Sequence, residues 1–225
     1  MQFKHAPVAV SAVFDDPNLV SVAGLVPMLR LARSAGLDEL AQSRLSVPTD
    51  KGANAVGKVM ALVAGMLAGA DSIDDMNLLR HGGMGRLFDR TYAPSTLGSF
   101  LREFRFGHVR QLDAVASRTL VNLASAAPLL QIRDGERVMV DVDDTIIEVH
   151  GYQKQGASFG YSGVRGLNAL VATASTTTSA PVILAQRLRQ GKTGSPKGAA
   201  RIVGDALATL RRTRAATGAR PLLRA

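Results

Sequence analysis

The stretch ERVMVDVDDTIIEVH, residues 136–150, decides how this 225-residue chain is built. It is rich in β-branched residues and apolar on both faces, which is typical of a central strand covered from both sides. Three carboxylates interrupt it, at Asp141, Asp143 and Asp144. In a strand, Asp141 and Asp143 point to one face and Asp144 to the other.

This density of carboxylates makes the same stretch the candidate site. Carboxylates in an apolar strand are costly unless they are paired or bind a cation. Mg²⁺ prefers hard oxygen ligands of this kind and commonly takes few of them from the protein. The alternative is a strand end at which the acids reach solvent or cap a turn.

The residues downstream predict the rest of a sheet. A glycine-rich segment at 151–166 is followed by apolar strands at 167–174 and 181–188. Ser195-Pro196 predicts the start of a helix, with Ser as its cap and Pro at its first position. Residues 220–224 then begin a further strand. The expected order is strand, strand, strand, helix, strand.

The residues upstream predict helices. Residues 7–23 alternate in a way that predicts two short strands joined by a turn. From residue 25 the period becomes helical, and we expect a helix that Ser95 caps and a longer one after it. The fold class is therefore α+β, divided into a short-stranded arm at 1–24, a helical and possibly DNA-binding region at 25–130, and an α/β domain at 131–225.

Composition excludes several classes of protein. The chain has no Cys, so disulfides, thiolate zinc sites and cysteine nucleophiles are ruled out, and its four His are dispersed. Aromatic residues make up 4% and Trp is absent, which weighs against modules that stack bases on aromatic platforms. The longest uncharged apolar run, at 59–70, is too short to span a bilayer. With no signal peptide evident, we expect a cytoplasmic protein without a membrane partner.

The positive charge is concentrated in the last third of the chain. Residues 149–225 carry twelve basic side chains and one acidic, whereas residues 1–148 carry fifteen and seventeen. Such a surface either faces phosphates or only keeps the protein soluble. Lys154 and Arg165 lie in the glycine-rich segment, which is a phosphate-contacting loop or a mere hairpin turn. The DNA-binding candidates are Lys154, Arg165, Arg187, Arg189 and Lys192.

Two families resemble the carboxylate stretch. Asp141, Asp143 and Thr145 match the D-x-D-x-T motif of haloacid-dehalogenase-type phosphatases, which implies Asp141 as nucleophile and Asp143 as general acid. That motif normally ends its strand and opens its domain. Here about 140 residues precede it, and residues 146–150 continue as strand.

The longer resemblance is to DDE transposases of the IS1380 type, within the IS4-like group. It covers AGLVPMLRLARSAGL near residue 30, APSTLGSFLREF at 93–104, and VMVDVDDTIIEVHGYQKQGASFGYSGVRGLNAL at 138–170. This resemblance implies a ribonuclease-H-like catalytic domain with Asp143 as the first catalytic carboxylate. Asp143 and Asp141 would hold Mg²⁺ or Mn²⁺, with Asp141 and Asp144 as fallback candidates for the catalytic position.

The resemblance also implies the partners. An intact transposase of this type binds double-stranded DNA at terminal inverted repeats, cuts it and joins the ends to a target, and we expect self-association on DNA and a nucleoid location. The second catalytic Asp of such enzymes follows the fourth strand, and residues 221–225 resemble that strand cut before its Asp. The expectation is therefore a truncated, inactive copy, or alternatively a catalytically dead DNA-binding fragment.

Overall fold

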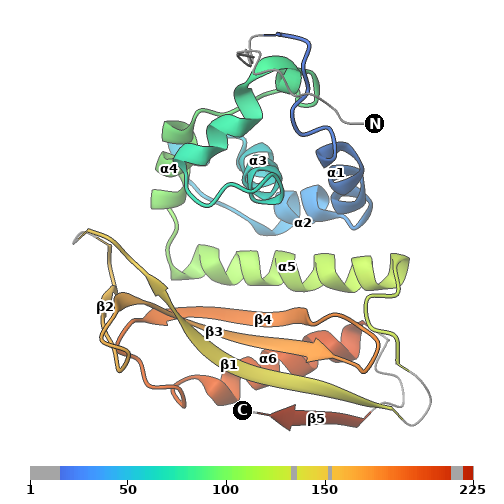
Figure 1. The fold of residues 1–225 in the computed structure, drawn as a ribbon, viewed down its shortest axis with the longest axis vertical. Coiled ribbons are helices and arrows are strands. Elements are labelled where there is room, and N and C mark those ends of the chain that lie inside the picture. The colour runs from blue at the N-terminus through green and yellow to red at the C-terminus, as the bar shows by residue number, and fades with distance from the viewer. Residues whose placement is uncertain (1–15, 133–135, 152–153, 214–219, 225) are drawn as a thin grey trace, which may run out of the picture.

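The computed structural model describes residues 16–132, 136–151, 154–213 and 220–224. Helices fill the N-terminal part and a mixed sheet the C-terminal part, so the predicted α+β class is confirmed (Figure 1). The boundaries predicted at residues 24 and 130 stay a prediction.

The helical part is built from short elements with turns between them. The α-helices are α1 (Leu25–Ser34), α2 (Leu37–Arg44), α3 (Ala55–Leu67), α4 (Pro94–Arg102) and α5 (Phe106–Ala126), and the 3-10 helices are η1 (Asp50–Gly52), η2 (Asp74–Arg80) and η3 (Gly82–Arg86). Their apolar faces meet in two clusters. One surrounds Leu25, Ala64 and Leu97, and the other surrounds Phe100, which is fully buried. Apolar burial of this kind is the main stabilising contribution.

Helix α5 joins the two parts of the molecule. In Figure 1 it runs along the sheet, between α1–α4 on one side and the strands on the other. Gln111 accepts a hydrogen bond from the backbone of Ser46 at 2.9 Å, and Asn122 donates to the carbonyl of Ala35 at 3.0 Å. These bonds fix α5 against both ends of α2.

The sheet has the strand arrangement of a partial ribonuclease-H-like domain. Its strands are β1 (Arg137–Glu148), β2 (Ser158–Phe159), β3 (Arg165–Ser175), β4 (Val182–Gln190) and β5 (Arg220–Arg224), and α6 (Ala199–Arg212) precedes β5. β1 is central, because it pairs antiparallel with β3 and parallel with β5. β4 and the short β2 pair with β3 on its other side. The predicted order of strands and helix is confirmed, with β2 as an addition.

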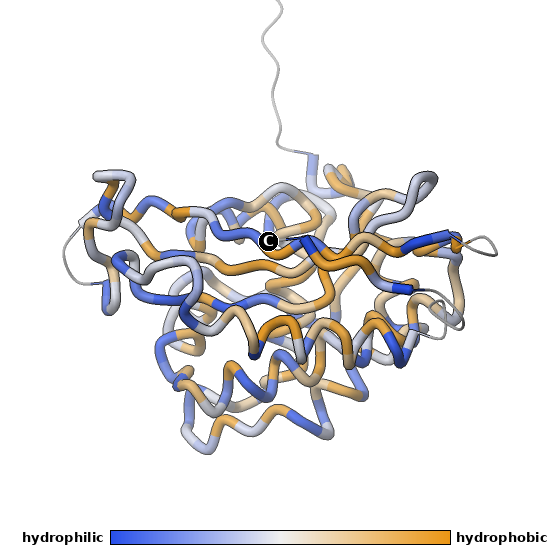
Figure 2. Tube along the Cα trace, turned by 90° about the horizontal axis from the view of Figure 1, so that it is seen from below, coloured by the Kyte–Doolittle hydropathy of each residue, from blue (hydrophilic) through white to orange (hydrophobic). Residues whose placement is uncertain are grey.

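One face of the sheet holds its core. Val138, Val140 and Val142 of β1 are buried there, together with Leu170 of β3 and Ile202 of α6. The opposite face carries no helix in the described part of the chain, so the expectation that β1 is covered on both sides is wrong. Figure 2 views the molecule from the sheet side and shows hydrophobic colour following the strands. We call these the helix-covered face and the open face.

Three local predictions need correction. The second of the two predicted short strands is absent, because residues 21–24 form a turn before α1. The first predicted strand lies mostly in residues 7–15, outside the described residues. Ser95 does not cap α4, because Ala93 is the N-cap and Pro94 takes the first position, where its missing N–H is no loss. Helix α6 begins at Ala199, after Gly198 with φ +84°.

Candidate functional site

The three carboxylates of β1 divide between the two faces of the sheet, as the period of two predicts. Asp141 and Asp143 lie on the open face with Thr145, while Asp144 lies on the helix-covered face with Val142. Asp143 and Thr145 are exposed, and the side chain of Asp141 is 25% exposed. The strand continues to Glu148, so the D-x-D-x-T stretch does not end it.

Asp144 is held by a polar network on the helix-covered face. Its Oδ2 accepts hydrogen bonds from Nη2 of Arg189 and from Nδ2 of Asn168, both at 2.7 Å. Its Oδ1 accepts one from Ser195 Oγ at 3.2 Å. The Arg189 side chain is only 7% exposed and Asn168 is buried, so Asp144 is a paired carboxylate inside the fold.

Arg189 also organises the connection between β4 and α6. Its Nε donates to Asn168 Oδ1 at 2.8 Å, and its Nη1 donates to the carbonyls of Ser195 and Lys197 at 3.2 and 2.5 Å. The guanidinium thus has its donors engaged within the chain. Arg189 was predicted to contact DNA, but this placement favours a structural role.

On the open face, Asp141 and Asp143 differ in how they are engaged. Asp141 accepts a hydrogen bond from Nε of Arg224 at 2.6 Å, and the two residues are register partners in the β1–β5 pairing. Asp143 accepts only the backbone N–H of Asp144, at 2.8 Å, and forms no ion pair among the described residues. Asp143 is therefore the carboxylate whose oxygens are most open to a ligand.

The pair fits a hard divalent cation in its chemistry. Both carboxylates lie on one exposed face and offer the oxygen ligands that Mg²⁺ and Mn²⁺ accept. No group of three or more His, Cys, Asp or Glu side chains able to hold a metal occurs among the described residues. Asp141 and Asp143 are therefore candidate ligands, and the described residues contain no complete metal site.

The remaining predicted DNA-binding residues fall into two groups. Arg187 faces α5 and α6, where its Nη2 lies 3.6 Å from Asp113 and 3.4 Å from Asp205. Lys154 and Lys192 are exposed and lie in adjacent loops, joined by a hydrogen bond of 3.1 Å from Gly191 to Gly156. The backbone N–H of Lys192 also donates to Ser158 Oγ, at 2.9 Å, which joins the two loops a second time.

Arg165 lies at the same end of the sheet. It donates to the carbonyls of Val149, at 3.2 Å, and of Gly151. Beside it is a hollow of about 390 Å³, lined by the ends of β1, β2 and β3 and by the adjoining loops, with His150 and Phe159 among the lining residues. Lys154, Arg165 and Lys192 therefore gather at the Glu148 end of β1, beyond Asp143 along the strand.

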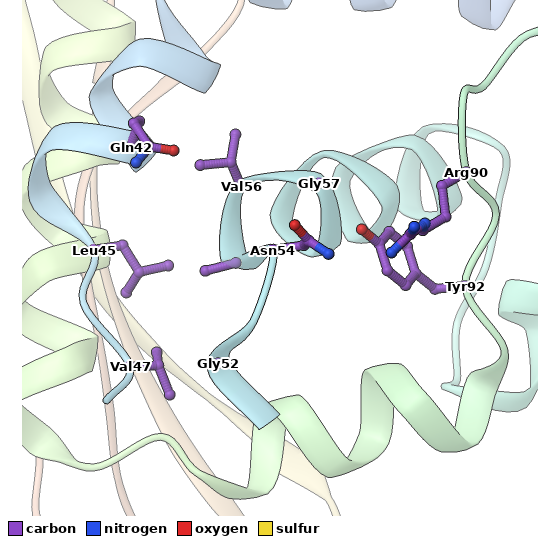
Figure 3. A pocket seen from close by; sticks show the side chains of 10 residues that line it. Gln42, Leu45, Val47, Gly52, Asn54, Val56, Gly57, Arg90 and Tyr92 are labelled. Carbon is purple, nitrogen blue, oxygen red and sulfur yellow. The ribbon is translucent and has the colours of Figure 1, made fainter. Parts of the chain in front are cut away.

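The helical part holds a second hollow that the sequence did not indicate. It measures about 540 Å³ and opens between α2, the start of α3 and the segment before α4 (Figure 3). Asn54, Arg90 and Tyr92 turn polar groups toward it. Asn54 has φ +54°, a conformation that Asn tolerates better than most residues, and periodicity carries no signal of it.

Near this hollow, Lys58 is a buried ammonium. Its Nζ donates to the carbonyl of Lys51 at 2.7 Å and lies 5.2 Å from the centre of the Phe100 ring. Burial lowers the pKa of Lys58, and the charge of Lys51 lowers it further. Lys58 therefore fixes η1 against α3 and α4.

Comparison with known protein families identifies a match to the whole described part of the chain. The sequence profile of the family described as Transposase DDE domain group 1 matches residues 4–225. No curated protein matches the chain, and no solved structure does. In the part of the chain that the structure describes, every helix is too short or too polar to cross a membrane.

Proposed function

The chain belongs to the Transposase DDE domain group 1 family, and on that premise we propose that it derives from an insertion-sequence transposase of the IS1380 type. Such an enzyme would cleave double-stranded DNA at terminal inverted repeats and transfer the ends to a target. One observation carries the proposal. Asp143 stands exposed on the open face of the central strand of a ribonuclease-H-like arrangement, between β3 and β5.

In this proposal Asp143 is the catalytic carboxylate and, with Asp141, a metal ligand. A divalent cation held there would lower the barrier to phosphoryl transfer by stabilising negative charge on the reacting oxygens. Asp143 needs no rearrangement to bind it, because no side chain among the described residues pairs with its oxygens. Asp141 must share its oxygens with Arg224 or release that guanidinium.

The basic residues would position the DNA. Lys154, Arg165 and Lys192 form one group at the Glu148 end of β1, so a duplex contacting them continues over the open face toward Asp143. Contacts of this kind go to phosphates and fix register without reading sequence. We leave Arg187 and Arg189 out of this proposed surface, because both pair with carboxylates of the chain itself.

A second candidate is a DNA-binding protein that does not cut. It is favoured by the absence of a third metal-ligating side chain beside Asp141 and Asp143 among the described residues. Two carboxylates alone are a sparse ligand set for the two metal ions that phosphodiester cleavage commonly uses.

The test uses the purified chain, duplexes that carry the inverted repeats flanking its gene, and Mg²⁺ or Mn²⁺. Strand cleavage by the wild type, lost in Asp143→Asn and kept in the control Asp74→Asn, supports the transposase. Asp74 is an exposed carboxylate of η2, distant in sequence from β1. Salt-sensitive binding without cleavage favours the second candidate. No binding to any duplex contradicts both.

A further inference from the structure

Helix α5 contributes to two groups of arginines at the junction with the sheet, and the first group is neutralised. Arg110 of α5 and Arg187 of β4 share the carboxylates of Asp113 and Asp205. Arg110 lies 3.0 Å from the carboxylate of Asp113 and 3.3 Å from that of Asp205. Arg187 lies 3.6 Å from Asp113 and 3.4 Å from Asp205. Two positive and two negative charges meet here, so this group is complete within the chain.

The second group has no such compensation. It consists of Arg44 at the end of α2, Arg118 in the middle of α5 and Arg212 at the end of α6, and we call it the junction arginine cluster. The bonds Ser46–Gln111 and Ala35–Asn122 run α2 antiparallel along α5, so Arg44 lies beside the middle of α5. The ion pair Arg110–Asp205 and the packing of Leu120 on the cluster that includes Leu210 run α6 along the same stretch, so Arg212 lies there too. Among the described residues, none of the three forms an ion pair with a carboxylate.

The pKa of Arg118 reflects the excess of positive charge in this cluster. Burial lowers the pKa of its guanidinium, and the charges of Arg44 and Arg212 lower it further. Its Nη1 donates to the carbonyl of Ala114, on its own helix, at 3.1 Å. The Arg44 and Arg212 side chains are exposed, so they can turn toward a ligand in front of Arg118.

Helix geometry explains only part of this arrangement. Basic residues at the ends of α2 and α6 stabilise those helices through the helix dipole. Arg118 lies more than two turns from the end of α5 and gains nothing from it. Three like charges with no carboxylate paired to them among the described residues repel one another, and an anion bound between them is favourable. Guanidinium groups match phosphate oxygens in geometry as well as charge.

We propose that Arg44, Arg118 and Arg212 form a binding site for the backbone phosphates of a DNA duplex, spanning the helical part and the sheet. The choice of DNA as the anion rests on the proposed function. Helices α5 and α6 lie on the helix-covered side of the sheet, while Asp143 faces the opposite side. The cluster therefore binds a stretch of duplex other than the one that reaches Asp143. It contributes to the affinity for DNA and takes no part in the cleavage step.

The test measures duplex affinity over a salt series for the wild type, Arg44→Met, Arg118→Met, Arg212→Met and the control Arg30→Met. Arg30 is an exposed arginine of α1 outside the cluster. Each phosphate contact contributes roughly 0.9 to the slope of log affinity against log salt, which is about eightfold in affinity at 0.1 M salt. We expect each cluster variant to lose about that much, Arg118→Lys to lose less, and Arg30→Met to match the wild type.

A second readout separates binding from structure. Without DNA, Arg118→Met removes a half-buried charge and its repulsion, so its melting temperature should equal or exceed that of the wild type at low salt. Unchanged affinity and slope in all three cluster variants would overturn this inference and leave the transposase proposal standing. A wild type that binds no duplex at all would overturn both. If Arg118→Met fails to fold, the exposed Arg44 and Arg212 decide the outcome.

Discussion

Both faces of the sheet carry Asp and Arg side chains, but these side chains have different roles on the two faces. On the helix-covered face, Asp144 and Arg189 form a pair whose arginine is 7% exposed. On the open face, Asp141 pairs with Arg224, whose side chain is 73% exposed, and Asp143 has no partner side chain among the described residues. One strand therefore carries a structural carboxylate and a candidate catalytic one in adjacent positions.

The comparison shows that a carboxylate's role follows from its face and partners. The Asp144 charge is compensated within the fold, so it is not available to a cation without loss of the network that it shares with Arg189 and Asn168. Asp143 keeps its oxygens toward solvent. The sequence left open which of the three aspartates is the catalytic carboxylate, and the geometry favours Asp143 over Asp144.

The largest effect should come from breaking the pair on the helix-covered face. Arg189→Met leaves the Asp144 carboxylate without its charged partner, and removing one member of a buried pair costs about 3 kcal/mol or more. Urea unfolding followed by circular dichroism measures this loss.

The matched variant replaces both partners. In Asp144→Leu/Arg189→Met no charge is left uncompensated, so stability should recover a substantial part of the loss. If Arg189→Met costs under about 0.5 kcal/mol, as surface substitutions usually do, the two faces do not differ as proposed.

The second largest effect on stability should come from one of two leucines in β4. Leu184 is 4% exposed on the helix-covered face, while Leu188 is 57% exposed on the open face. Leu184→Ala should cost about 3 kcal/mol, because it leaves a cavity against α6. Leu188→Ala should stay within about 0.5 kcal/mol. Thermal and urea unfolding of both variants measure the difference, and equal losses would show that the open face is covered in solution.

These leucines also show where sequence reasoning stops. Strict alternation places Leu184 and Leu188 on the same face. In the structure the β3–β4 register shifts between Ala172 and Thr173, so Leu184 becomes the extra residue of a bulge. Bulges depend on both strands of a pair and leave no trace in the alternation of one strand. The pairing of Asp144 with Arg189 also depends on the β3–β4 register, so the sequence alone could not predict it.

What the sequence predicted well rests on local periodicity. The period of two within β1 was enough to separate Asp141 and Asp143 from Asp144. The apolar stripe of α6, which includes Ile202 and Leu210, also packs as expected. Helix starts were less certain, because several caps compete locally, as at Ser95.

The third effect requires a metal ion. Asp143→Asn should be neutral or stabilising in metal-free buffer, because it removes one of two neighbouring like charges on the open face. The wild type should gain about 1.4 kcal/mol when Mg²⁺ is ten times its Kd, and Asp143→Asn should lose that gain. Melting curves with and without Mg²⁺ measure it.

The control lies on the other face. Asp144→Asn should be destabilised without metal, because Arg189 loses its charge partner, and should keep its response to Mg²⁺. A large destabilisation of Asp143→Asn in metal-free buffer would instead assign Asp143 a structural role.

The smallest effect should come from the ion pair on the open face. Arg224→Ala removes the partner of Asp141, but an exposed pair contributes only about 0–1 kcal/mol and is screened by salt. The loss should therefore shrink in 1 M NaCl, whereas the loss in Arg189→Met should persist. Arg220, at the other end of β5, is opposite Arg137 in the register, so Arg220→Ala relieves repulsion and should not destabilise. If Arg224→Ala instead costs more than about 2 kcal/mol at both salt concentrations, Asp141 is as firmly paired as Asp144. Its oxygens would then be unavailable to a cation, and Asp143 alone would remain as a ligand on this face.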